Sequence, residues 1–243
     1  MEEWYNVLKV AYKKYLIHGA RSNEKLKPIH SWIGNKILKK LNGDNFKVVF
    51  IDSDNSSEYL VEGKYYPKRE DIVVLYENKP IFVISFKFVT SNYKQNVNNY
   101  FENLIGECAN IRTANIGFGH ILVLRDKIPY FKKSREISKV EIPNDKDLKK
   151  YFKLYDDRTS MLHAPNLFFV DIISITPFLE QEQNYIPGNV TDNDLRNKNI
   201  EVKDGINFLR LSNEIKERIK ETNILDFINQ TVKFCKELAK NQK

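Results

Sequence analysis

A lysine lies inside one of the most apolar stretches of this sequence of 243 residues. The segment PIFVISFKFVTS begins at Pro80, and its first ten residues are apolar except for Ser85 and Lys87. Side chains alternate between the two faces of a strand, so one face of this segment would carry Ile81, Val83, Ser85, Lys87 and Val89. Both faces are apolar enough to be covered, and an ammonium buried without a partner costs several kcal/mol. We therefore expect a carboxylate or an anionic ligand beside Lys87, the alternative being a lysine at the strand end whose stem extends to water.

An acidic residue begins the apolar run that precedes this segment. In PKREDIVVLY, residues 67–76, Asp71 comes immediately before four apolar residues. A four-residue turn between the two runs would put Asp71 opposite Phe86, and Glu70 would then share the face of Lys87. A bulge or a shorter turn would move Asp71 onto that face, and the sequence leaves both possibilities open.

A carboxylate and an ammonium at the ends of neighbouring strands can act together on a phosphodiester. The oxygens of Asp71 would bind Mg²⁺, which polarises a phosphate. Lys87 would steady the attacking hydroxide and the charge that develops on the phosphorus oxygens. The two residues therefore predict metal-dependent cleavage of a phosphodiester bond.

Changes of periodicity along the chain predict the elements that position these residues. Apolar residues at intervals of three and four predict helices over residues 4–15, 29–41, 94–112, 145–156 and from about 213 to the end. Alternating or continuous apolar runs predict strands over residues 46–51, 58–65, 71–76, 81–89, 119–125 and 167–175. Helices, an antiparallel meander, a helix and a further strand indicate an α/β fold in one domain, residues 1–243.

Composition favours a soluble, cytoplasmic protein that is attracted to polyanions. The chain has 39 Lys and Arg against 32 Asp and Glu, a formal net charge of +7, which favours nucleic acid as a partner. Cys108 and Cys235 lie in helix-like stretches, so we expect neither a disulfide framework nor a zinc cluster. No run approaches the roughly 18 apolar residues of a membrane helix, and we expect no membrane partner. The histidines lack metal-ligand spacing, and no phosphate-binding glycine loop implies ATP.

The order of these features resembles a known nuclease core. Asp71, a hairpin, residues 85–87, a helix and a further strand resemble the PD-(D/E)xK nuclease superfamily, to which many type II restriction endonucleases belong. The run SNYKQNVNNYFENLIGE that follows is similar to an asparagine-rich run in XhoI-type restriction enzymes. The resemblance covers residues 45–125 and implies a restriction-endonuclease-like core, a mixed central sheet flanked by helices. Residues 1–42 and 126–243 would then be additions for dimerisation and DNA recognition.

The sequence departs from that family at one metal ligand. Ser85 stands where the family has Asp or Glu two residues before the lysine. In a rearranged subset of these nucleases the next helix supplies the carboxylate, and Glu102 and Glu107 are the candidates, on opposite borders of the predicted apolar stripe. We choose Glu102, because it follows Asn98 by one turn and aligns with the glutamate of the XhoI-like run. Glu107 stays an alternative, and Glu24 is a further candidate acid in the N-terminal region.

The resemblance implies a magnesium-dependent restriction endonuclease that makes double-strand breaks at a specific DNA sequence. Mg²⁺ would be held by Asp71, Glu102 and the backbone carbonyl of Phe86, and the catalytic residues would be Asp71, Ser85, Lys87 and Glu102. The residues expected to contact DNA carry paired donors and acceptors or a positive charge: Asn92, Lys94, Gln95, Asn96, Asn98 and Asn99. The alternative is that the same residues cap the next helix and position phosphates.

The partners implied by the resemblance are double-stranded DNA, a second copy of the chain in a homodimer, and a cognate DNA methyltransferase. Two other interpretations stay open. In the first of them, the chain is a DNA-binding protein of the same fold that has lost catalysis. In the second, it is a structure-selective or repair nuclease.

Overall fold

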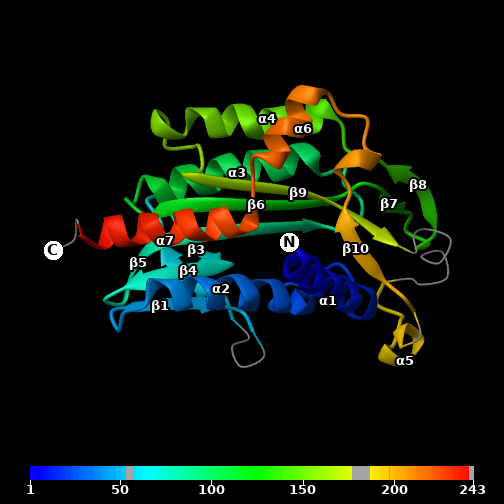
Figure 1. The fold of residues 1–243 in the computed structure, drawn as a ribbon, viewed down its shortest axis with the longest axis horizontal. Helices are drawn as coiled ribbons and strands as arrows, with labels where there is room; N and C mark the ends of the chain where they lie inside the picture. The colour runs from blue at the N-terminus through cyan, green and yellow to red at the C-terminus, as the bar shows by residue number, and fades with distance from the viewer. Residues whose placement is uncertain (53–56, 177–186, 197, 241–243) are drawn as a thin grey trace.

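The computed structural model describes residues 1–52, 57–176, 187–196 and 198–240, and a six-stranded sheet runs through its middle (Figure 1). In their order across the sheet, the strands are β1 (Phe46–Phe50), β4 (Ile72–Tyr76), β5 (Lys79–Val89), β6 (Gly117–Arg125), β9 (Leu167–Thr176) and β10 (Glu201–Asp204). Strands β5, β6 and β9 are parallel to one another, and the other neighbouring pairs are antiparallel. The predicted α/β class, a mixed central sheet flanked by helices, is confirmed.

Helices cover both faces of the sheet (Figure 1). One layer contains α1 (Glu2–His18), α2 (Lys27–Leu41) and α7 (Ile224–Lys240), and the other contains α3 (Val97–Arg112), α4 (Asp145–Asp156) and α6 (Asn213–Lys220). The first layer packs against the phenylalanine face of β5, which includes Phe82 and Phe86. The second packs against the face that includes Val83 and Val89. Both faces of β5 are therefore covered, as its apolar sequence predicts.

The remaining elements lie outside the central sheet. They are the hairpin of β2 (Tyr59–Glu62) and β3 (Pro67–Glu70), the hairpin of β7 (Ile128–Phe131) and β8 (Ile137–Glu141), the short helix α5 (Asp192–Leu195), and the 3-10 turns η1 (Asn23–Lys25), η2 (Asp157–Thr159) and η3 (Ile206–Phe208). The expectation that residues 58–65 add a strand to the central meander is wrong. Strand β1 pairs directly with β4, so β2 pairs with β3 in a sheet of two strands.

The turn between β4 and β5 is shorter than the expected four residues. Only Glu77 and Asn78 connect the strands, and both have a positive φ, 49° and 64°. Two successive residues with positive φ are typical of tight hairpin turns whose twist matches that of the strands. Tyr76 consequently pairs with Lys79, two residues earlier than the predicted partner Ile81.

An irregularity in the same hairpin reduces the difference from the predicted register from two residues to one. The ladder skips Ile81, and beyond it Ile72 pairs with Ile84. Ile81 packs in the same core as Phe82, so the prediction that it shares a face with Val83 is wrong. A bulged residue breaks the alternation of side chains at one position, which the period of the sequence does not reveal.

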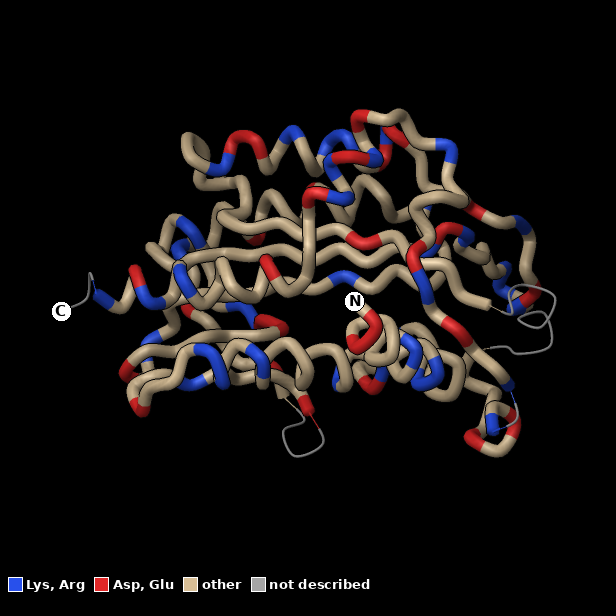
Figure 2. Tube along the Cα trace, in the orientation of Figure 1, with Lys and Arg blue, Asp and Glu red and all other residues tan. Residues whose placement is uncertain are grey.

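Three expectations from composition can be compared with the structure. Cys108 and Cys235 are both buried and unpaired, as expected of small apolar side chains in helices. No helix in the described part of the chain is both long enough and apolar enough to cross a membrane. Basic and acidic segments are interspersed over both helical layers (Figure 2), so the positive charge is not gathered on one helix.

Candidate active site

Asp71 lies between β3 and β4, beside the strand that carries the lysine. Its Oδ2 accepts a hydrogen bond of 2.7 Å from the backbone N–H of Phe86. The skipped residue in β5 brings the start of β4 to this position. Burial raises the pKa of Asp71 to about 6, although the Phe86 N–H and the charge of Lys87 favour the ionised form. Asp71 is therefore a carboxylate held in a defined orientation and partly shielded from water.

Lys87 lies near the carboxyl end of β5. Its Nζ is 6.0 Å from the centre of the Tyr100 ring on α3, within the range of a cation–π interaction. The side chain is partly exposed, yet its charge is close enough to Asp71 to lower the pKa of that carboxyl against the effect of burial. Lys87 thus combines features of both expectations, since it is partly exposed and its ammonium acts on a carboxylate.

Helix α3 contributes a carboxylate to the same strand, and that carboxylate is Glu107. Its Oε2 accepts a hydrogen bond of 3.0 Å from the hydroxyl of Ser85. Burial opposes the ionisation of Glu107, but the charge and the hydrogen bond of Lys68 outweigh burial and lower its pKa. The hydroxyl of Ser85 thus holds the acid that the helix supplies.

The structure does not bring Glu102, the helix carboxylate that the sequence favours, to Ser85. Glu102 is exposed, and its charge acts on Lys150 of α4. Five residues correspond to a rotation of about 140° around a helix, so Glu102 and Glu107 cannot face the same strand. The rotation of α3 is set by its buried residues, which include Leu104 and Cys108, and this rotation directs Glu107 toward Ser85.

Lys68 and Glu70, both on β3, complete the cluster of charges. The Nζ of Lys68 lies 2.8 Å from Oε1 of Glu107 and 3.5 Å from Oε1 of Glu70. Lys68 is missing from the site that the sequence predicts, although it stands two residues before Glu70 and must share its face in a strand. Burial raises the pKa of Glu70 to about 8, opposed by Lys68 and increased by the negative charges of Glu107 and Asp71.

The raised pKa of Glu70 predicts a stability that falls as the pH rises. The folded protein binds the proton of Glu70 more tightly than the unfolded chain does. The contribution of Glu70 to the free energy of unfolding is therefore complete below about pH 4.5 and is lost as the pH rises through about 8. Between pH 5 and pH 8.5, Glu70→Gln should therefore lose less of its free energy of unfolding than the natural protein. The difference should be at least about 1.4 kcal/mol, the free energy of one pKa unit. Urea unfolding of both proteins at pH 5 and pH 8.5 measures it, and parallel losses in the two proteins would contradict the assignment.

Two histidines lie next to these groups, and burial keeps both uncharged at neutral pH. His30 is fully buried, and its Nε2 lies 4.0 Å from Oδ1 of Asp71, too far for a hydrogen bond. Burial lowers the pKa of His30 to about 4 and that of His120 to about 3. His120 pairs in register with Ser85. The positive charge of the cluster therefore comes from its lysines.

Three of the predicted DNA contacts line one groove beyond the carboxyl end of β5. Asn92, Gln95 and Asn96 border a cavity of about 560 Å³. Among the described residues that line it, the charged ones are Arg21, Lys132 and Arg135, and none of these described residues is acidic. Tyr100, whose ring lies beside the ammonium of Lys87, also lines this groove. The groove is therefore next to Lys87. Such a lining favours a polyanion.

The other predicted DNA contacts do not line this groove. Lys94 forms an ion pair with Asp147 of α4, and its backbone N–H donates to Glu141. Asn98 accepts a hydrogen bond of 3.1 Å from Lys150, and Asn99 is exposed. Asn92 itself also has a structural part, because its Oδ1 accepts from the backbone N–H of Phe131 at 3.0 Å.

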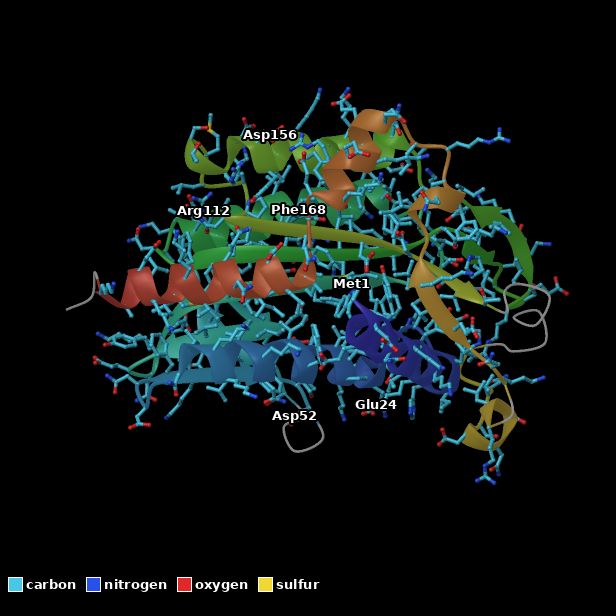
Figure 3. The ribbon with its side chains drawn as sticks, in the orientation of Figure 1. Met1, Glu24, Asp52, Arg112, Asp156 and Phe168 are labelled. Carbon is cyan, nitrogen blue, oxygen red and sulfur yellow. The ribbon has the colours of Figure 1, made fainter. Side chains whose placement is uncertain are left out.

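Glu24, the further candidate acid, is occupied by lysines. It lies in η1 at the edge of the N-terminal helices (Figure 3), and its carboxylate pairs with Lys27 and, at 3.3 Å, with Lys14. The hydrogen bonds of these two lysines lower the pKa of Glu24. Nothing in these contacts links Glu24 to Asp71 or Glu107.

The cluster contains oxygen donors of the chemical class that a hard divalent cation binds. Asp71 and Glu107 offer carboxylates of the kind that Mg²⁺ binds, and Glu70 adds a buried carboxylate whose Oε1 makes no hydrogen bond. The ammonium of Lys68 already stands as a cation between Glu70 and Glu107. Within the described ranges, no three or more His, Cys, Asp or Glu side chains form a ready metal-binding group.

Comparison with models of protein families, with curated proteins and with solved structures found no significant match to this chain. The class that the fold and the cluster define is an α/β protein with carboxylates and lysines gathered at one end of a β-hairpin and the helix that follows it. The resemblance to the PD-(D/E)xK superfamily stays a prediction.

Proposed function

We propose that this protein is a type II restriction endonuclease with a restriction-endonuclease-like core, which cleaves both strands of DNA at a specific sequence with Mg²⁺. The observation that carries the proposal is the convergence of Asp71, Glu107 and Lys87 around residues 85–87 of β5. The order of the hairpin β4–β5, helix α3 and the parallel strand β6 also agrees with the core that the sequence resemblance implies. The groove beside Lys87, whose described lining carries Arg21, Lys132 and Arg135, supports a nucleic acid as the substrate.

In this proposal each residue of the cluster has a separate task. Asp71 and Glu107 would hold Mg²⁺, with the backbone carbonyl of Phe86 as a further ligand; the bound ion would polarise the scissile phosphate and favour hydroxide over water. Ser85 keeps Glu107 in place through its hydrogen bond. The ammonium of Lys87 orients the attacking oxygen and stabilises the charge that develops on the phosphorus oxygens.

A palindromic DNA site has two-fold symmetry, and a homodimer would present one such cluster to each strand. We therefore include a dimer in the proposal, and a cognate DNA methyltransferase as the partner that a restriction system needs to protect its own DNA.

One observation favours a second candidate, a DNA-binding protein of the same fold without catalytic activity. Ser85 offers no carboxylate, and Oε1 of Glu107 is already paired with Lys68. Loss of one acid weakens a metal site more than it weakens the basic groove, so DNA binding could persist without cleavage.

Incubation of the purified protein with phage DNA and Mg²⁺, followed by sequencing of the fragment ends, separates these functions. Restriction activity gives discrete fragments whose ends share one sequence. Specific binding without cleavage in either Mg²⁺ or Mn²⁺ would replace the proposal by the inactive DNA-binding protein. A smear without common ends would indicate a structure-selective or repair nuclease.

A further inference from the structure

Lys68 is placed between two carboxylates of the candidate active site. Its Nζ lies 2.8 Å from Oε1 of Glu107 and 3.5 Å from Oε1 of Glu70. Glu70 is only 1% exposed, and its Oε1 makes no hydrogen bond. Lys68 is a lysine that the structure places beside this buried acid, and it favours the ionised form of Glu70 against the effect of burial.

The two oxygens of Glu107 have different partners. Oε2 accepts from the hydroxyl of Ser85, and Oε1 faces the ammonium of Lys68. A cation that approaches Glu107 through Oε1 must therefore share this oxygen with Lys68 or displace it. Displacement is sterically possible, because the side chain of Lys68 is 27% exposed and its stem has four rotatable carbons.

The positive charge of Lys68 also acts on the other carboxylate of the proposed metal site. It lowers the pKa of Asp71 against the effect of burial, as Lys87 does. A divalent ion and the ammonium of Lys68 would thus neutralise the same carboxylates, and their mutual repulsion disfavours both being present.

We infer that Lys68 is a tethered counter-ion of the active site, which occupies Glu107 and Glu70 in the metal-free protein and competes with Mg²⁺ for them. This inference rests on the proposed function, since it assumes that Glu107 holds the ion. In the free protein Lys68 then neutralises the carboxylate of Glu107, and binding of Mg²⁺ requires the side chain of Lys68 to swing toward solvent.

The test compares the affinity for Mg²⁺, without DNA, of the natural protein and Lys68→Met by isothermal titration calorimetry. Lys68→Met should bind Mg²⁺ about tenfold more tightly, because the competing charge is gone and the length of the side chain is kept. Lys64→Met is the matched control. Lys64 is an exposed lysine in the connection between β2 and β3, the strand that carries Lys68. Its replacement therefore removes one positive charge and leaves Lys68 paired with the carboxylates.

The outcomes separate this inference from the function on which it rests. Tighter binding in Lys68→Met but not in Lys64→Met supports the counter-ion. Binding that is unchanged or weaker in Lys68→Met, while the natural protein binds Mg²⁺, overturns this inference alone. A natural protein that binds no Mg²⁺ overturns both. If Lys68→Met does not fold, judged by circular dichroism, Lys68→Gln is used with the same criteria.

Discussion

Replacement of Lys87 by alanine should lower the rate of Mg²⁺-dependent DNA cleavage by about 10³-fold, while the protein still binds DNA. The ammonium lies at the end of β5 beside Asp71, where it would stabilise negative charge that exists only in the transition state. Removal of one such preorganised donor typically costs 10²- to 10³-fold in rate. DNA binding depends on many cationic contacts, so the loss of one changes it little. Single-turnover cleavage of a linear DNA and fluorescence anisotropy of a labelled duplex measure the two effects.

Lys79→Ala is the control for this variant. Lys79 begins the same strand and is exposed at its opposite end, so its replacement removes the same charge from β5 away from the carboxylates. Cleavage by Lys79→Ala should remain near that of the natural protein. Equal activity of Lys87→Ala and the natural protein would remove Lys87 from the mechanism. A parallel loss of cleavage and DNA binding in Lys87→Ala would assign it to binding alone.

Glu107→Gln should lower the rate of cleavage at a fixed, low concentration of Mg²⁺ by about 10²- to 10³-fold. Glutamine keeps the shape of the side chain and one oxygen for the hydroxyl of Ser85, but it lacks the charge that would hold Mg²⁺. More Mg²⁺ should recover part of the rate, because a weakened site fills at higher concentration. The dependence of the rate on Mg²⁺ concentration, measured for the natural protein and the variant, provides the comparison.

Glu102→Gln is the matched control on the same helix. The substitution has the same chemistry, but Glu102 is exposed and directed toward α4. Its rate and Mg²⁺ dependence should therefore be those of the natural protein. If Glu102→Gln loses activity and Glu107→Gln does not, the carboxylate that the sequence favours is the metal ligand, and the helix is rotated differently in the active protein.

The sequence by itself determined the kinds and approximate positions of the main elements and the most unusual residue among them. Local periodicity depends on each segment alone, and it predicted α4 at residues 145–156 and α3 and β6 to within three residues of their starts. An ammonium in a strand covered on both faces also requires a nearby acid wherever the strand lies. The residue types and their order along the chain therefore predict an acid near Lys87, with Glu70 and Asp71 as the two candidates.

Only the tertiary structure decided which side chains meet. The two-residue turn and the skipped Ile81 together pair Ile72 with Ile84, one residue away from the predicted register, and a shift of one residue is invisible in an apolar pattern. Glu107 and not Glu102 contacts Ser85, because the rotation of α3 follows from packing against strands that lie elsewhere in the chain. Lys68 and His30 reach the cluster from a separate hairpin and from α2. Secondary structure follows from short-range periodicity, whereas the site depends on contacts between distant segments, whose geometry is fixed only when the core is packed.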